Sequence, residues 1–263
     1  MSTRQLVGSW VAVLAVGAIL TAWGCRSQAE PTKDLALDLG GGVTMQLVFI
    51  PAGKFIMGHE NDKDEHEVTL SKPFYMGVTL VTQAQYQAVM GANPSKFKGE
   101  ANPVETVSWE DATEFCKKLS EKTRQAVRLP TEAEWEYACR AGSHTQFCFG
   151  DSTEGLGEYA WYQNNSDMKT HPVGQKKPNA WGLYDMHGNL WQWCADWYGN
   201  YPKGAVKDPK GAASGGERVL RGGCWINAAD VCRCANRNHV IPVGRISYNG
   251  FRVVVTAPGA DLK

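Results

Sequence analysis

The chain has 263 residues, with 27 basic and 27 acidic side chains and therefore no net charge. A chain without a positive excess lacks the electrostatic attraction that nucleic-acid-binding proteins use, so no nucleic-acid partner is expected. Its 43% hydrophobic and 21% charged residues exclude global disorder. The 10 Trp and 28 Gly residues predict a compact fold rich in tight turns, rather than a helical bundle.

The N-terminus has the pattern of an export signal. Arg4 precedes a nearly continuous apolar run, Leu6–Trp23, which ends at Gly24 and Cys25. This pattern is typical of a bacterial lipoprotein signal over residues 1–25, in which Cys25 carries the lipid. The alternative is a transmembrane anchor, because the run is just long enough to span a bilayer. Either interpretation exports the chain to the cell envelope or outer surface and tethers it to a membrane, with residues 26–44 as a polar linker.

The globular part is expected over residues 45–255, and it begins with strands. Met45–Ile50 and Lys54–Met57 flank the turn residues 51–53 and predict a hairpin. Glu65–Leu70 and Phe74–Leu80 are further strand candidates.

Three helices with clear capping signals follow the strands. Thr82 is the N-cap of a helix over Gln83–Met90 that Gly91 closes. Ser108 and Thr131 each have an acidic residue three positions later, which is the capping-box pattern. The second helix has one apolar face, and the third, which ends at Gly142, has a shorter one. These faces are Trp109, Ala112, Phe115, Cys116 and Leu119, then Trp135, Ala138 and Cys139.

Helical periodicity disappears between residues 142 and 250, and the last strand is expected at Gly250–Val255, before a tail over residues 256–263. Six tryptophans in this stretch can hold irregular backbone in one core: Trp161, Trp181, Trp191, Trp193, Trp197 and Trp225. Asp196 and Arg252 are charges in apolar surroundings and need partners.

Cys25 aside, seven of the eight cysteines remain, and an odd number in an exported chain leaves at least one free thiol or an intermolecular bond. Cys116 and Cys139 are expected to be core residues. Cys232, Cys234 and His239 supply three metal ligands at most, so they are not expected to bind zinc.

Residues 47–255 resemble the formylglycine-generating-enzyme and sulfatase-modifying-factor family. The matching segments occur in the family's order: residues 49–53 and 55–58, Asn102-Pro103-Val104, 107–109, 128–136, 179–189, 191–198, Arg221-Gly222-Gly223 and Gly250-Phe251-Arg252. The resemblance implies an α+β class and a variant of the C-type lectin fold, with few helices, small antiparallel sheets and many ordered loops.

The resemblance also implies a calcium site, which is the one cofactor considered for this chain; none is required. Its ligands are the Asp185 side chain, the Gly188 and Leu190 carbonyls and the Gln192 side chain. Oxygen ligands around a tight turn suit calcium. Gln192 stands where the family has an acidic residue, so only one anionic ligand remains. The alternative is a hydrogen-bonded turn.

The family's enzymes use two cysteines, four residues apart after the Gly-Gly pair, to hold copper, a metal that soft thiolates suit. Here the first position is Asn227 and the second falls near Cys232, so no pair has the family's spacing. We therefore expect that the protein is not an enzyme.

A non-catalytic branch of the fold comprises the variable proteins of diversity-generating retroelements, whose C-terminal stretch binds ligand. Here residues 221–252, the C-terminal segment, alternate motif residues with side chains that follow neither helical nor strand periodicity. The expected ligand-binding residues are Ile226, Asn227, Asp230, Val231, Arg233, Cys234, His239, Val240, Val243, Gly244, Ile246, Ser247 and Tyr248.

The sequence thus predicts a membrane-anchored, surface-displayed protein that binds an unknown protein or glycan through a diversified segment. The alternatives are a fixed-specificity lectin-like binder, a formylglycine-generating oxidase and a structural envelope module without a ligand.

Overall fold

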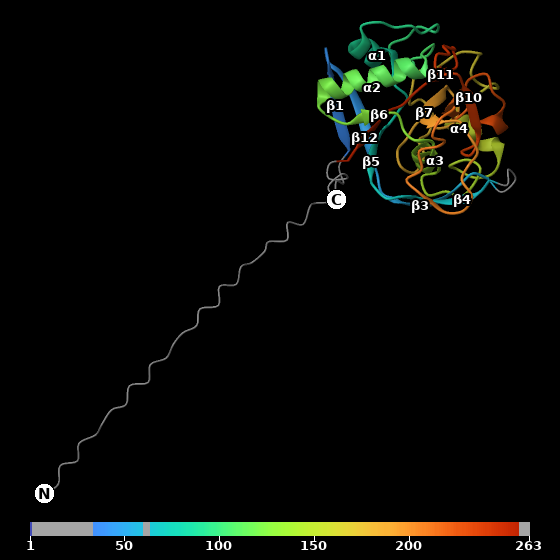
Figure 1. Ribbon diagram of the computed structural model, residues 1–263. Helices are drawn as coiled ribbons and strands as arrows, with labels where there is room; N and C mark the ends of the chain where they lie inside the picture. The colour runs from blue at the N-terminus through green and yellow to red at the C-terminus, as the bar shows by residue number, and fades with distance from the viewer. Residues whose placement is uncertain (2–33, 60–63, 258–263) are drawn as a thin grey trace. The chain divides into compact units, whose positions relative to one another are not determined.

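The computed structural model describes residues 1, 34–59 and 64–257 (Figure 1). The expected signal sequence, Cys25 and the last six tail residues lie outside the described residues. Within the described part, no helix combines the length and the apolar content needed to cross a membrane.

A five-stranded antiparallel sheet forms one side of the core, in the order β1-β2-β5-β12-β6. Its strands are β1 (Leu35–Gly40), β2 (Val43–Ile50), β5 (Phe74–Gly77), β12 (Val254–Thr256) and β6 (Val127–Arg128). The expected linker over residues 26–44 is therefore wrong from Leu35 onward. Leu37 and Leu39 are buried and alternate with the exposed residues Ala36 and Asp38, and this short stretch is a strand that pairs with β2.

Two smaller sheets complete the fold. One has the order β3-β4-β8, with β3 (Gly53–Met57), β4 (His66–Leu70) and β8 (Val206–Lys207). The other has the order β10-β9-β7-β11, with β10 (Arg237–Val240), β9 (Arg218–Arg221), β7 (Trp191–Trp197) and β11 (Asn249–Gly250). The predicted hairpin of β2 with β3 is wrong, because β2 pairs with β1 and β5 whereas β3 pairs with β4. The chain changes sheets at Pro51, which is not available as a ladder donor.

The three predicted helices are confirmed as α1 (Gln83–Met90), α2 (Trp109–Thr123) and α3 (Glu132–Arg140), each with a complete capping box. Short helical turns follow at η2 (Thr153–Gly155), α4 (Leu156–Tyr159) and η3 (Ala229–Cys232). α1 and α2 contact the five-stranded sheet, whereas α3 contacts β3, β7 and β9. The α+β class is therefore confirmed.

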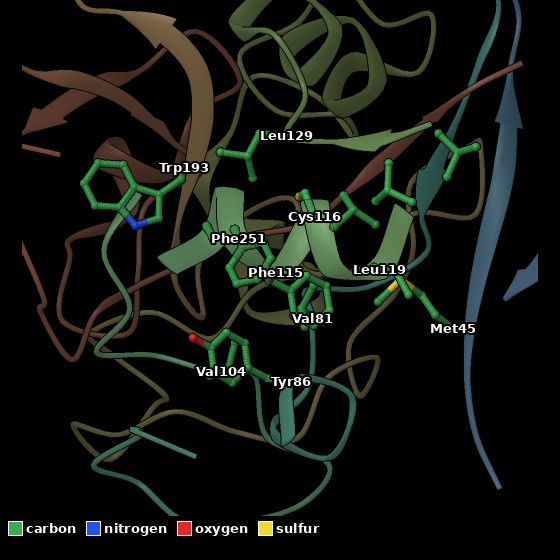
Figure 2. Packing of buried hydrophobic residues seen from close by; sticks show 14 of the residues in the cluster. Met45, Val81, Tyr86, Val104, Phe115, Cys116, Leu119, Leu129, Trp193 and Phe251 are labelled. Atoms are coloured by element: carbon green, nitrogen blue, oxygen red, sulfur yellow. The ribbon is translucent and has the colours of Figure 1, made fainter. Parts of the chain in front are cut away.

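The buried face of α2 is the predicted one, since Ala112, Phe115, Cys116 and Leu119 are all buried. Figure 2 shows Phe115, Cys116 and Leu119 beside residues from distant parts of the chain. The Phe115 ring lies 5.2 Å from that of Phe251 near the C-terminus. This core therefore joins the first half of the chain to its end.

The predicted last strand is interrupted. Asn249–Gly250 pairs with β7, and only Val254–Thr256 continues the large sheet. Thr256 is thus part of a strand and Ala257 is buried, so the expected tail begins later than predicted. The backbone bends between the two strands and places Arg252 inside the protein.

Candidate functional site

The C-terminal segment starts from a backbone that only glycine can adopt. Gly222 and Gly223 follow β9 with φ angles of 101° and 73°. A Cβ atom on Gly223 would lie 2.7 Å from the Cys232 Sγ, and one on Gly222 would crowd Trp135. The pair therefore packs the start of the segment directly against α3.

A buried network of charges holds the end of β9 and the start of β10 to α3, through Arg221 and Arg237. Arg221 pairs with Glu136, and neither side chain is exposed to solvent. Arg237 donates to both oxygens of Glu132, at 2.6 and 2.8 Å. Arg221 also donates to the carbonyls of residues 235 and 236, at 2.6 and 2.7 Å. These bonds fix the backbone of the segment rather than its outer side chains.

Trp225 holds the middle of the segment in place. Its ring is buried, and its indole nitrogen donates to the carbonyl of Ser247 at 3.2 Å. Its own carbonyl accepts a 2.6 Å hydrogen bond from the Ser166 hydroxyl. The two halves of the segment are thus joined across a single buried side chain.

The predicted ligand-binding residues divide by exposure. Ile226, Asp230 and Val243 are exposed, with 38% exposure at Ile226 and 54% at Val243. Ile241, which the sequence analysis did not select, is 52% exposed and belongs with them. Val240 and Val243 on either side of it were selected, so the apolar side chain of Ile241 in the same non-periodic stretch was an available signal.

A second group is half-buried: Asn227, Val231, Arg233, His239, Val240, Gly244, Ile246, Ser247 and Tyr248. Val231, Val240 and Tyr248 pack against the main core. His239 stacks on Tyr198, with a centroid distance of 4.0 Å, and its Nδ1 lies 2.7 Å from Glu217. These side chains expose edges, rather than whole surfaces, to solvent.

Asn227 has a structural role. Its side-chain oxygen accepts a 3.0 Å hydrogen bond from the Cys224 amide. We expect Asn227→Ala to lower the free energy of unfolding by about 1–3 kcal/mol, because it leaves that amide without an acceptor. Ile226→Ser and Val243→Ser, at exposed positions, should each change it by less than about 0.5 kcal/mol. Urea unfolding followed by Trp fluorescence measures all three, and equal costs would contradict this division.

The expectation for Cys234 is wrong, because its side chain is fully buried. Its Sγ lies 3.4 Å from that of Cys139 on α3. Cys232, near the second catalytic position of the family's enzymes, is also fully buried, and burial raises the pKa of its thiol. A reactive cysteine must be accessible and must ionise readily to the thiolate, and Cys232 meets neither requirement.

Of the four predicted calcium ligands, the Gln192 side chain is already engaged in hydrogen bonds within the protein. The Gln192 side-chain oxygen accepts hydrogen bonds from Trp135 at 2.8 Å and from the Arg252 guanidinium at 2.6 Å. The side-chain nitrogen of Gln192 (Nε2) donates to the backbone carbonyl of Asp185 at 2.8 Å. The positively charged Arg252 guanidinium therefore lies on the Gln192 oxygen that a calcium ion would need as a ligand. Calcium needs six to eight such oxygens. The described geometry is that of the hydrogen-bonded turn. Arg252 and Asp196, which were expected to need partners, are not bonded to each other. Arg252 donates to the Gln192 side chain, and Asp196 accepts from the Glu132 amide.

A pocket of about 400 Å³ lies beside β10 and was not predicted from the sequence. Its lining includes His66, Glu132, Asp196, Tyr201 and Arg237. Burial raises the pKa of Asp196 to about 7, and the nearby charge of Glu132 adds to this effect. The sequence pointed to this pocket only through Asp196, an acidic residue in a segment rich in tryptophan.

Comparisons with known proteins agree on one family. A family model described as the sulfatase-modifying factor enzyme 1-like domain matches residues 41–257. The chaperone protein LppX of Paenibacillus barcinonensis is 30% identical, over 93% of this chain and 98% of LppX. The formylglycine-generating enzyme of Mus musculus is 33% identical over 74% of this chain, which spans only 55% of that enzyme. The solved structure of Treponema denticola variable protein 1 superposes with a TM-score of 0.81, at 36% identity, over 85% of this chain and 99% of that one.

Proposed function

Because the chain belongs to the sulfatase-modifying factor enzyme 1-like family, we propose that it uses this scaffold to bind a ligand through its C-terminal segment. The observation that carries the proposal is the exposure of Ile226, Ile241 and Val243 on a backbone that the buried charges and Trp225 hold in place. Exposed apolar side chains that lie within one short segment can contribute to an interaction surface.

The mechanism is recognition without chemistry. The backbone of the segment is already ordered by Gly222, Gly223 and the Arg221 network, so little conformational entropy is lost on binding. Ile226, Ile241 and Val243 supply apolar area, and His239 with Tyr198 supplies an amphipathic edge. The partner is a protein or a glycan.

The segment is further proposed to be diversified, as in the variable proteins of diversity-generating retroelements. The likeness to Treponema denticola variable protein 1 supports this. So does the division of the segment into buried frame residues and exposed residues.

Sequencing the locus in several clones, with a few kilobases on either side, tests diversification. The expected result is a near-copy of the codons for residues 221–252 that differs at adenines and lies near a reverse transcriptase gene. A single invariant copy without such a neighbour would overturn diversification and leave a binder of fixed specificity.

We also propose that Cys25 anchors the chain to the cell envelope through a lipid. Metabolic labelling with palmitate should mark the wild-type chain and not Cys25→Ser. A labelled Cys25→Ser variant, or an unlabelled wild type that stays in the membrane fraction, would contradict lipid attachment at this residue.

A chaperone role is the second candidate, and the near full-length likeness to LppX is the observation that favours it. A chaperone for one client needs a constant surface. Invariance of residues 221–252 among isolates would therefore favour this function over diversified recognition.

A further inference from the structure

Three metal-binding side chains meet in the interior, away from the exposed residues of the proposed binding surface. Cys139 lies on α3, His187 precedes β7 and Cys234 precedes β10. All three are buried, and their ligand atoms lie within 4.8 Å of one another. The two Sγ atoms are 3.4 Å apart, and the Cys139 Sγ is 3.9 Å from the His187 Nε2.

The hydrogen bonds of His187 identify its tautomer. Its Nδ1 lies 2.7 Å from the carbonyl oxygen of Cys232, which can only accept, so Nδ1 carries the proton. Its Nε2 accepts a long, 3.3 Å contact from the Cys148 amide and is therefore the unprotonated nitrogen. A neutral imidazole whose far nitrogen bonds a carbonyl is the usual form of a metal-ligating histidine. The free electron pair of His187 is thus on the nitrogen beside Cys139, as metal binding requires.

The spacing suits a small tetrahedral ion. Zinc lies about 2.3 Å from sulfur and about 2.0 Å from nitrogen, so neighbouring ligand atoms in a tetrahedron are roughly 3.5–3.8 Å apart. The observed 3.4 and 3.9 Å separations lie close to that range. The Cys234 Sγ and the His187 Nε2 lie within 4.8 Å of each other, so side-chain movements of up to about 1 Å would complete the three-ligand arrangement.

The charges favour a divalent ion. Two thiolates in a buried place carry two negative charges, which are costly to bury alone. One Zn²⁺ with two thiolates and a neutral imidazole leaves no net charge. The Phe147 and Phe149 rings pack edge-on against His187, at 5.6 and 6.0 Å, and shield the group from water.

We propose that Cys139, His187 and Cys234 form a zinc-binding site that joins α3 to the C-terminal segment. Binding replaces the two thiol protons, which pass to solvent, and the ion takes the place of the long Cys148 contact on Nε2. A fourth tetrahedral position remains for water or for the half-buried Cys148 thiol. The site does not depend on the proposed ligand-binding function.

The test uses the full chain, stripped of metal and kept reduced with a phosphine. Zn²⁺ should bind at one ion per chain, and Co²⁺ in its place should give the thiolate-to-cobalt charge-transfer band and the intense visible bands of a tetrahedral site. Cys234→Ser should weaken Zn²⁺ binding by at least about 100-fold. Cys116→Ser, which makes the same change at a buried cysteine of α2 outside the group, should not.

Three results would overturn the site. One is a wild-type chain that gives no charge-transfer band with Co²⁺, a measurement that does not depend on the folding of any variant. Another is equal Zn²⁺ affinity in Cys116→Ser and Cys234→Ser. The third is a Cys139–Cys234 disulfide, found by peptide mapping of protein isolated from cells with its thiols blocked.

Discussion

Arg221→Met is expected to lower the free energy of unfolding by about 3–5 kcal/mol, because it removes one of the two guanidinium groups that pair with the buried Glu136 carboxylate and also leaves buried carbonyls without a donor. Glu136 would keep the bonds to its Oε1 from the Arg140 guanidinium, at 2.9 Å, and from the Gly58 amide, at 3.0 Å, but its Oε2 would lose the Arg221 guanidinium. The carbonyls of residues 235 and 236 would lose their donor as well. Urea unfolding followed by Trp fluorescence measures the change.

The matched control is Arg245→Met, which makes the same substitution in an exposed pair with Asp111. Exposed ion pairs contribute little to stability, so the urea midpoint should hardly move. Equal shifts in the two variants would mean that the buried network does not hold the segment. If the network does hold it, Arg221→Met should also weaken any binding through residues 221–252 even where the variant remains folded.

The second large effect is a pH dependence of stability that comes from Asp196. Burial and the nearby charges of Glu132 and Glu134 raise the pKa of this carboxyl to about 7. The hydrogen bond from the Glu132 amide and the charge of the Arg237 guanidinium oppose this rise. The ordinary value is 3.8, so between pH 4 and pH 7 the folded state holds a proton that the unfolded state has lost. The contribution of Asp196 to stability is therefore largest below pH 4 and is lost as the pH rises through 7, by about 4 kcal/mol in all.

Asp196→Asn removes this titration and keeps an oxygen for the 2.8 Å hydrogen bond from the Glu132 amide. Its stability relative to the wild type should therefore rise between pH 5 and about pH 7, with a slope approaching 1.4 kcal/mol per pH unit below the folded-state pKa, and then become constant toward pH 8. Urea unfolding at each pH measures the difference.

Asp208→Asn is the control for this experiment, because the Asp208 carboxyl accepts from the Ser71 amide and hydroxyl and its pKa is lowered. It is ionised in both states from pH 5 to pH 8, so the difference between this variant and the wild type should be constant in that range. A constant difference for Asp196→Asn would contradict a raised pKa at that site.

The helices were predictable because their signals are local. A capping box needs only two residues three positions apart, and all three helices begin where Thr82, Ser108 and Thr131 predicted. The buried face of α2 follows from spacing along one helix in the same way. The family and the C-type lectin-like fold, which the ordered motifs predicted, are confirmed by the matching family model and by Treponema denticola variable protein 1.

Strand partners were not predictable, because pairing depends on residues distant in the sequence. β1 is six residues long and was taken for linker, and β2 and β3 were expected to pair across a turn that in fact leads from one sheet to another. Burial was not predictable from the sequence either. Cys234 is fully buried, although its neighbours in the segment include exposed and half-buried residues. Sequence periodicity gives no information on burial where the chain is irregular.

The sequence by itself determined the family, the helices and the segment that carries the exposed residues, because each follows from motifs read along the chain. Tertiary structure alone decided which side chains meet. It gave Gln192 to Trp135 and Arg252 rather than to calcium, and it placed Cys139, His187 and Cys234 together. Side chains 48 and 95 residues apart come within 4 Å only when sheets and helices pack, and no local pattern encodes that distance.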